Sequence, residues 1–210
     1  MRIGELSRRT GVSVPTIKFY VREGLLPAGE LTSPNQASYA ETHVQRLRLI
    51  RALLDVGGLS VADIREVIAA IDDSGRTVHQ VLGDATERMV PRYDREPSAG
   101  LEEARERVAE LIAARGWQTY SGGRTTEVLV AALAALYEVG HGSFDQVLDV
   151  YADAAERVAQ ADLEYVARYV AREELVERVA VGTVLGDVIF SALRRLAQVD
   201  ASERVFGESI

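Results

Sequence analysis

Residues 13–26 read SVPTIKFYVREGLL, and this stretch decides the fold of the N-terminal part of the chain. Ser13 is a favourable N-cap, and Pro15 fits the first turn of a helix, where its missing backbone N–H costs nothing. Gly24 provides a stop, because glycine readily takes the left-handed conformation that ends helices. The stretch therefore predicts a helix that begins near Val14 and ends at Gly24.

The predicted helix has one apolar face and one polar face. Ile17 and Val21, with Tyr20 beside them, form the inward stripe. The side chains left for the outer face or its rim are hydroxylic, cationic or aromatic: Ser13, Thr16, Lys18, Phe19 and Arg22. In a helix-turn-helix, the first residues of the second helix reach base edges, while cations and hydroxyls hold phosphates. An ordinary amphipathic surface helix would show the same face, so the neighbouring segments must decide.

The segments on both sides favour a helix-turn-helix with a wing. Upstream, the apolar residues of 3–12 share one face, which predicts a short helix that ends at Gly11. Downstream, residues 28–38 are rich in Gly, Ser, Pro, Asn and Gln, a composition typical of turns. We therefore expect a hairpin wing just before Tyr39.

Two more helices follow the predicted wing. Apolar residues recur at helical spacing: Val44, Leu47, Ile50 and Leu54. Arginines lie off this stripe: Arg46, Arg48 and Arg51. The segment from Ser60 to Asp63 has the form of a capping box, and it predicts a fourth helix that runs to about Ile71.

Together these segments resemble a known family. Residues 3–26, IGELSRRTGVSVPTIKFYVREGLL, and residues 38–68, SYAETHVQRLRLIRALLDVGGLSVADIREVI, look like the DNA-binding domain of the MerR family of transcriptional regulators. The resemblance covers about the first 72 residues. It implies a winged helix-turn-helix on a four-helix core, which works as a homodimer on a palindromic operator.

The resemblance also implies which residues touch DNA. In the recognition helix these are Thr16, Lys18, Phe19, Tyr20 and Arg22, and in the wing they are Tyr39 and its neighbours. Two positions depart from the family pattern, since Phe19 replaces a common tyrosine and Ala37-Ser38 stands where an arginine is common. These departures remove two phosphate contacts and should weaken binding. Wing residues that still offer hydrogen bonds are Asn35, Gln36 and Ser38, although a plain turn would contain them equally well.

Charge is unevenly distributed along the chain. The 210 residues carry a formal net charge of −8, yet residues 1–51 sum to +4, which leaves −12 for the remainder. A basic head on an acidic body is typical of a DNA-binding module joined to a domain with another partner. The N-terminus has no apolar segment of the kind that signal peptides contain. We therefore expect a soluble cytoplasmic protein without a membrane role.

The region after residue 72 departs from the simplest family plan. Residues 73–97 predict a linker with a short helix at 77–90, and they contain Pro91 and Pro97. Many relatives continue instead into one long antiparallel coiled coil, which these prolines would interrupt. A helix at 101–114 is either a shortened dimer helix or an ordinary packed helix.

The rest of the chain predicts helices only. One helix spans residues 125–139, and another is expected to follow a capping box at Ser143. Residues 173–198 are nearly continuous in apolar side chains, but Asp187 and the pair at 194–195 argue against a membrane span. We expect a central helix that is buried on most sides.

Two glycines inside this helix, Gly182 and Gly186, stand on one face. Glycine weakens a helix interior, so these positions predict a close helix contact, either within the chain or between two copies. The fold class is therefore mainly α, with a small β wing. The expected domains are a DNA-binding domain at 1–72, a linker at 73–97, and a helical dimerisation and sensing domain at 98–210.

Catalytic and metal chemistry find no support in the sequence. His43, His79 and His141 show no metal-ligand spacing, and the paired acids at 102–103 and 173–174 lie at helix starts, where the helix dipole explains them. The chain contains no cysteine, which excludes a thiolate metal site, an iron–sulfur cluster and a disulfide framework. We expect neither an enzyme nor a resident cofactor or metal.

An effector, where one exists, should then be an organic molecule or a partner protein. Aromatic residues offer candidates for a pocket that takes an apolar or cationic molecule: Trp117, Tyr120, Tyr137, His141, Phe144 and Tyr151. Aromatic residues at helical spacing are as typical of an ordinary core.

The sequence thus predicts a regulator that binds double-stranded promoter DNA as a homodimer. The resemblance implies that such a protein distorts the promoter so that RNA polymerase engages it, a mechanism that reads DNA deformability. Two alternatives stay open at this point. One is a ligand-sequestering protein whose DNA binding is autoregulatory, and the other is an architectural DNA-binding protein whose helical tail contacts other proteins.

Overall fold

The computed structural model describes residues 1–33, 36–73, 75, 77, 79–80, 83, 98–118, 123–169 and 175–207. They fall into two compact units, residues 1–81 with 176–210, and residues 82–175. The fold is mainly helical with one small sheet, as the sequence predicts. Most of the expected linker at 73–97, with its short helix, lies outside the described residues, and so do Asn35 and Tyr120.

The first unit begins with the predicted pair of helices. Helix α1 (Ile3–Thr10) ends where Gly11 takes a φ of 72°, a left-handed conformation that suits glycine. Helix α2 (Val14–Arg22) begins at Ser13, whose hydroxyl accepts the backbone N–H of Thr16 at 3.2 Å. Their apolar faces meet in a core that fully buries Leu6 and Ile17. Local capping chemistry and periodicity therefore place both helices correctly.

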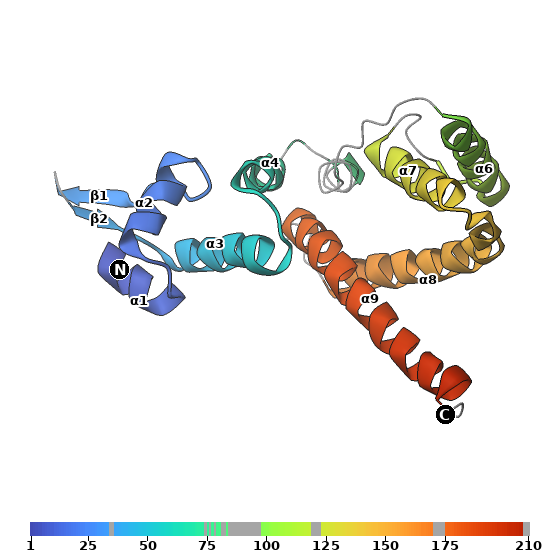
Figure 1. Ribbon diagram of the computed structural model, residues 1–210. Helices are drawn as coiled ribbons and strands as arrows, with labels where there is room; N and C mark the ends of the chain where they lie inside the picture. Colours follow the sequence, from blue (N-terminus) through green and yellow to red (C-terminus); the bar gives the residue numbers. More distant parts are fainter. Residues whose placement is uncertain are drawn as a thin grey trace. The chain divides into compact units, whose positions relative to one another are not determined.

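The predicted wing is a two-stranded antiparallel sheet beside these helices (Figure 1). Strand β1 (Glu30–Ser33) pairs with β2 (Gln36–Ser38), so that Leu31 faces Ala37. The base of the wing is tight at Gly29, where an added Cβ would lie 2.8 Å from the carbonyl oxygen of Ser38 and 3.0 Å from the ring of Tyr39. Only a residue without a side chain fits there.

The third helix changes its winding before it ends. Helix α3 (Glu41–Arg51) continues into η1 (Ala52–Val56), a π-helical turn. The α-helical spacing predicts that Leu54 is buried, but the structure fully buries Leu53 and leaves Leu54 half-buried. Leu53 stands three residues after the buried Ile50, so the two residues share one helix face.

Helix α4 (Val61–Asp72) opens on the predicted capping box. The Ser60 hydroxyl accepts the Asp63 N–H at 3.2 Å, and the Asp63 carboxylate accepts the Ser60 N–H at 3.3 Å. The inner face of α4 adds Ile64, Val67 and Ile68 to the core of the first unit. The four-helix arrangement expected of residues 1–72 is therefore present.

The long C-terminal helix α9 (Leu175–Phe206) corrects a prediction. It belongs to the first unit, not to a single domain at 98–210. Its Val184 is 2% exposed and lies so close to Gly57 that a Cβ added there would be 2.5 Å from the Cγ1 atom of Val184. The expectation of burial on most sides is wrong, because every described side chain from residue 187 to 207 is exposed. A continuous apolar sequence predicts that a surface is buried, but it does not identify the segment or the partner that buries it.

The second unit is built on three helices: α6 (Ala99–Arg115), α7 (Arg124–Glu138) and α8 (Asp145–Tyr169). Their shared core buries Leu101, Ala104, Val108, Leu111, Val130, Leu133, Ala134, Leu148 and Ala152. The apolar face of the helix predicted at 101–114 is thus used up inside this unit, which favours the ordinary packed helix over a dimer helix. The predicted capping box at Ser143 does not form, because a short 3-10 turn, η2 (Gly142–Phe144), precedes α8.

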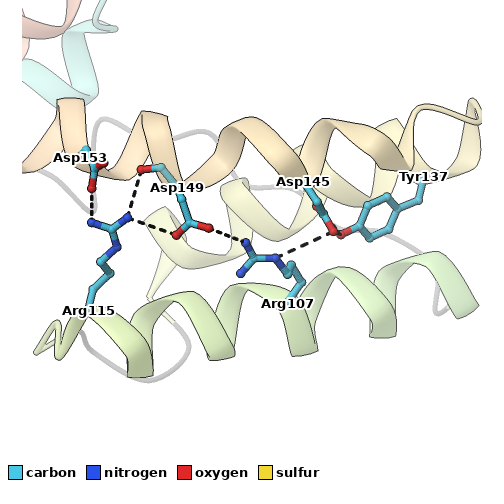
Figure 2. Close-up of polar contacts among 6 residues, drawn as sticks. All are labelled: Arg107, Arg115, Tyr137, Asp145, Asp149 and Asp153. Carbon is cyan, nitrogen blue, oxygen red and sulfur yellow. Dashed lines mark hydrogen bonds and ion pairs between the residues drawn. The ribbon is translucent and has the colours of Figure 1, made fainter.

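A row of ion pairs fastens α8 to α6 (Figure 2). Arg107 reaches Asp149 at 3.4 Å and Asp145 at 3.9 Å. Arg115 pairs with Asp149 at 3.1 Å and also with Asp153. Residues four apart lie on one helix face, so the three aspartates of α8 form a single acidic edge along α6.

Candidate nucleic-acid interface

The outer face of α2 carries the predicted recognition residues. Lys18 and Ser13 are exposed, while Thr16 is half-buried and its hydroxyl shares a 2.7 Å hydrogen bond with that of Ser13. The side chain of Arg22 is 72% exposed, and its guanidinium carbon lies 5.4 Å from the ring centroid of Phe19. A cation and hydroxyls therefore line the first turns of α2, and a guanidinium held over an aromatic ring follows at its end.

Two predicted contact residues are mostly buried. Tyr20 is 7% exposed, and burial, followed by the negative charge of Asp55, raises the pKa of its phenol. Tyr39 is 8% exposed, and its ring packs edge-on against His43 with centroids 5.1 Å apart. Packing accounts for both aromatic rings in this structure, and their contact with DNA stays a prediction.

A hollow of about 310 Å³ joins the recognition helix to the wing. Its lining comes from α1, α2 and the hairpin: Arg2, Ile3, Lys18, Leu31, Gln36, Ala37 and Tyr39. The fold thus brings Lys18 from the helix together with Gln36 from the wing, two residues that the sequence places in separate elements. Ser38, also predicted from the wing, is half-buried at the end of β2 and does not line the hollow.

Arg2 is the residue that sequence reasoning missed. It precedes α1 as its N-cap residue in an extended conformation and is exposed. Its neighbour is tied to the base of the wing, because the Tyr39 N–H donates to the Met1 carbonyl at 2.8 Å. This contact joins residues far apart in the sequence, so no local pattern could have predicted it. The sequence showed only that Arg2 carries a positive charge, and not that this charge lies beside the wing.

Some cations of the first unit form salt bridges within the chain, and others have no carboxylate nearby. Arg9 pairs with Glu41 at 2.8 Å, and Arg65 pairs with Glu23 at 2.5 Å. Within the part of the chain that the structure describes, no carboxylate lies within 4 Å of Arg2 or Lys18. These two cations point into the same hollow, and they are the groups best placed to bind phosphate there.

The candidate effector residues that the structure describes are not gathered at one place. The Trp117 indole N–H donates to Glu156 at 2.8 Å, whereas the Tyr137 hydroxyl donates to Asp145 at 2.8 Å. These two acids are separated on α8 by roughly 16 Å at the rise of an α-helix. Phe144 packs edge-on against Tyr151, with centroids 5.6 Å apart, near the Tyr137 end.

The exposed His141 also lies near that end, next to η2. The described candidates therefore form a group around η2, with Trp117 apart from it. In the described ranges, no cluster of three His, Asp or Glu side chains is arranged to hold a metal ion. Over the same residues, none of the helices is long and apolar enough to cross a membrane.

Comparison with known proteins agrees with this geometry. Residues 1–71 match the family described as MerR HTH family regulatory protein. The chain is 35% identical over 89 residues to the HTH-type transcriptional regulator HmrR of Sinorhizobium medicae (strain WSM419), which covers 42% of this chain and 60% of that protein. It is 34% identical over 71 residues to the mercuric resistance operon regulatory protein of Bacillus cereus, covering 34% of this chain and 53% of the relative. The matched part is thus less than two thirds of either relative.

One solved structure resembles the chain along its whole length. It is the crystal structure of the putative transcriptional regulator SCO5550 from Streptomyces coelicolor A3(2). The TM-score is 0.74 and the identity is 34%, with all of both chains covered. The similarity to HmrR and to the Bacillus cereus protein is confined to less than half of the chain, whereas this one includes the second unit and α9. Residues 1–71 are therefore a MerR-family helix-turn-helix domain.

Proposed function

We propose that this protein is a transcriptional regulator that binds a palindromic promoter site as a homodimer and distorts the DNA. The observation that carries the proposal is the hollow between α2 and the wing, where Lys18 and Arg2 lie beside Gln36. Cations without carboxylate partners supply affinity for phosphate, and an amide supplies a directed hydrogen bond. The exposed start of α2 adds Ser13 and Thr16 for contact with base edges.

Binding to the promoter upstream of the protein's own gene tests the proposal directly. Lys18→Ala and Arg22→Ala should each lower affinity for all DNA sequences, because both remove a cation that holds phosphate. Thr16→Ala should change sequence preference instead, since it removes a hydroxyl near the bases. Fluorescence anisotropy with specific and scrambled duplexes measures both effects.

Arg204→Ala is the matched control for these variants. It removes the same charge from α9, where Arg204 is 70% exposed and pairs with Asp200 at 2.7 Å. Its affinity for DNA should equal that of the wild type. Unchanged binding in all three α2 variants would contradict the assignment of α2 as the recognition helix.

Distortion of the site is the proposed link to RNA polymerase. A regulator that kinks or untwists the DNA between promoter elements selects sequences that deform easily, including bases that it does not touch. Footprinting should then show a hypersensitive step near the centre of the palindrome. Its position relative to the promoter elements distinguishes activation from repression.

We also propose that an organic small molecule, not a metal ion, controls the protein. The names of several relatives refer to heavy metals or mercury. This chain has no cysteine, so it lacks the thiolate ligand with which many proteins bind such metals. The aromatic group around η2, with Tyr137, Phe144 and Tyr151, offers apolar surface next to carboxylates.

A thermal-shift comparison tests the effector proposal. Apolar organic cations should raise the melting temperature, whereas zinc, copper(I) and mercury(II) salts should not, because a ligand that binds only the native state stabilises it. Phe144→Ala should remove the organic response. Stabilisation by a metal ion alone would overturn the proposal.

A further inference from the structure

Arg65 on helix α4 reaches across to the end of the recognition helix. Its Nε–H donates to the Glu23 carbonyl oxygen at 2.9 Å, and its Nη2 donates to the Glu23 Oε2 atom at 2.5 Å. Glu23 is the C-cap residue of α2 and lies 42 positions before Arg65 in the sequence. One guanidinium therefore binds both the main chain and the side chain of the residue that ends α2.

The contact with the carbonyl suits the end of a helix. The last carbonyls of a helix lack partners within it and carry partial negative charge, which a cation stabilises. The Tyr20 carbonyl accepts the N–H groups of Leu25 and Leu26 at 2.9 and 3.2 Å. Arg65 supplies a donor to the Glu23 carbonyl in the same turn. The guanidinium thus helps to fix the point at which α2 ends.

The contact with the carboxylate concerns a neighbouring cation, Arg22. The Arg22 Nε lies 3.8 Å from the Glu23 Oε1 atom. A charge-assisted hydrogen bond between nitrogen and oxygen measures about 2.7–2.9 Å, so this second pair is loose. Glu23 therefore binds Arg65 closely and does not form a hydrogen bond with Arg22.

Arg22 is held in place by an aromatic ring. Its side chain is 72% exposed, and its guanidinium carbon lies 5.4 Å from the ring centroid of Phe19. An aromatic face attracts a cation without occupying its N–H donors. Arg22 is thus oriented by Phe19 while its N–H groups stay available for an anion.

We propose that Arg65 is a positioning residue for DNA binding, because it holds the Glu23 carboxylate away from Arg22. The inference rests on the proposed function, in which Arg22 holds a DNA phosphate. Without Arg65, the carboxylate would turn to its remaining cation, Arg22, and phosphate would have to displace it. Arg65 then affects DNA binding from α4, through another side chain.

Arg65→Ala should lower affinity for DNA of any sequence by about twofold to fivefold for each α2 that docks. This range corresponds to the strength of an exposed ion pair between Arg22 and Glu23, which phosphate must break. Fluorescence anisotropy with specific and scrambled duplexes measures the loss.

Arg9→Ala is the matched control. The side chains of Arg9 and Arg65 are 40% and 46% exposed, and each pairs with one glutamate. Both variants remove one positive charge and release one carboxylate, but only Arg65→Ala releases the carboxylate next to Arg22. Arg65→Ala should therefore bind more weakly than Arg9→Ala. Equal affinities would overturn the proposal, because the loss of charge alone would explain them.

A second substitution separates positioning from support of the fold. Glu23→Gln in the Arg65→Ala background removes the released carboxylate and should restore affinity to within about twofold of the wild type. The same substitution in the wild-type background should gain less, since Arg65 already holds that carboxylate. If Arg65 only supported the fold, the double variant would bind no better than Arg65→Ala, and this result would overturn the proposal.

The effect must also pass through Arg22. In the Arg22→Ala background, Arg65→Ala should change affinity much less than in the wild type, because no guanidinium remains for Glu23 to bind. Additive losses would contradict the proposed route.

The side-chain Nε–H resonance of Arg22 reports the same contact without DNA. Its absence from the spectrum of Arg22→Ala assigns it. In Arg65→Ala it should move downfield as Glu23 approaches, and Glu23→Gln should reverse the change. An unmoved resonance would overturn the positioning role, whether or not the protein binds DNA. A resonance that moves in a protein without DNA affinity would refute the regulator function, and the control of Arg22 by Arg65 would stand.

Discussion

The proposed DNA interface depends most on two residues, Lys18 and Arg2. Both side chains line the hollow beside the wing, and neither has a carboxylate partner in the described structure. If each holds one phosphate, each contributes to the release of counterions when DNA binds. Their effect should therefore appear in salt dependence as well as in affinity.

We predict that Arg2→Ala and Lys18→Ala each flatten the plot of log affinity against log salt by about two units of slope for the homodimer, since each lost phosphate contact accounts for about 0.9. The physical reason is the loss of one phosphate contact per subunit that docks on DNA. Anisotropy titrations between low and moderate salt measure the slope. Arg8→Ala, which removes an exposed cation outside the hollow, is the control. A slope for Arg2→Ala equal to that of the wild type would show that Arg2 does not touch DNA.

At this scale the sequence predicts what is local. Ser13 as a cap and Gly11 as a stop follow from the conformations that those residues favour, and the structure confirms both. The position of Arg2 beside the wing could not be predicted, because its neighbour Met1 is held by a hydrogen bond between residues 1 and 39. Burial of Tyr20 and Tyr39 was equally out of reach, since an aromatic side chain suits both a core and a DNA contact.

Among the secondary-structure elements, the contact between α9 and η1 depends on a missing side chain. A Cβ at Gly57 would lie 2.5 Å from the Cγ1 of Val184 and 2.8 Å from the Leu53 carbonyl oxygen. Both distances are shorter than atoms tolerate. Helix α9 can therefore approach the end of the third helix only where residue 57 is glycine.

We predict that Gly57→Ala weakens this contact and lowers the stability of the first unit by about 1–3 kcal/mol, the usual cost of overpacking. Proteolysis should then release α9 faster. Gly4→Ala is the matched control, because nothing lies within 4 Å of its added Cβ and alanine favours the helix. Equal protease resistance of the two variants would argue against docking of α9 at this site.

The ion pairs between α6 and α8 give a second prediction for an element. Arg115 is 19% exposed and reaches Asp149, Asp153 and Glu156. Arg115→Ala should destabilise the second unit, because one side chain serves several carboxylates.

Arg105→Ala is the comparison for that variant. Arg105 has one partner, Glu127 at 2.6 Å, and its side chain is 45% exposed, so the loss should be smaller. Chemical denaturation at low and high salt measures both variants, and the difference should shrink in high salt. A larger loss for Arg105→Ala would contradict the importance given to the row of ion pairs.

Helices with a regular spacing of apolar residues were predictable from the sequence. The segments against which they pack were not. The bounds of α6 and α7 follow closely from apolar spacing and from glycines that stop them. Helix α9 was correctly read as a helix, but its surroundings were wrongly read as a core. An apolar run carries no information about whether the same chain or another copy covers it.

For the molecule as a whole, Tyr137 gives a pH dependence that can be measured. Burial, followed by the hydrogen bond to Asp145 and the charge of that carboxylate, raises the pKa of Tyr137 to about 12. In the unfolded chain a tyrosine loses its proton near pH 10. Between these values the unfolded state has lost a proton that the folded state keeps, so stability must fall as pH rises.

We predict that a difference titration of wild-type protein minus Tyr137→Phe, followed by phenolate absorbance, has its midpoint near pH 12. The loss of stability between pH 10 and 12 should be smaller in Tyr137→Phe, which lacks the proton concerned. Tyr165→Phe, which changes an exposed tyrosine on α8, serves as the control. A midpoint near 10 for Tyr137 would mean that the phenol does not hold its place beside Asp145.

The division of charge also belongs to the whole molecule. The positive sum of residues 1–51 lies in the unit that would face DNA, whereas the acidic edge of α8 lies in the other unit. Composition alone was sufficient to predict this separation. The assignment of α9 to the first unit was not, since it depends on contacts between residues more than a hundred positions apart.

Because of the π-helical turn at residues 52–56, the number of residues in the third helix determines which side chains face α9. A π-turn is an α-helix that has gained one residue without gaining height, so the extra residue turns everything after it by about 100°. Here the rotation brings Gly57 to the side where Val184 packs. Deleting one residue of 52–56 would keep a continuous helix but present a different residue to α9. Within this helix, the number of residues determines the direction in which its end faces.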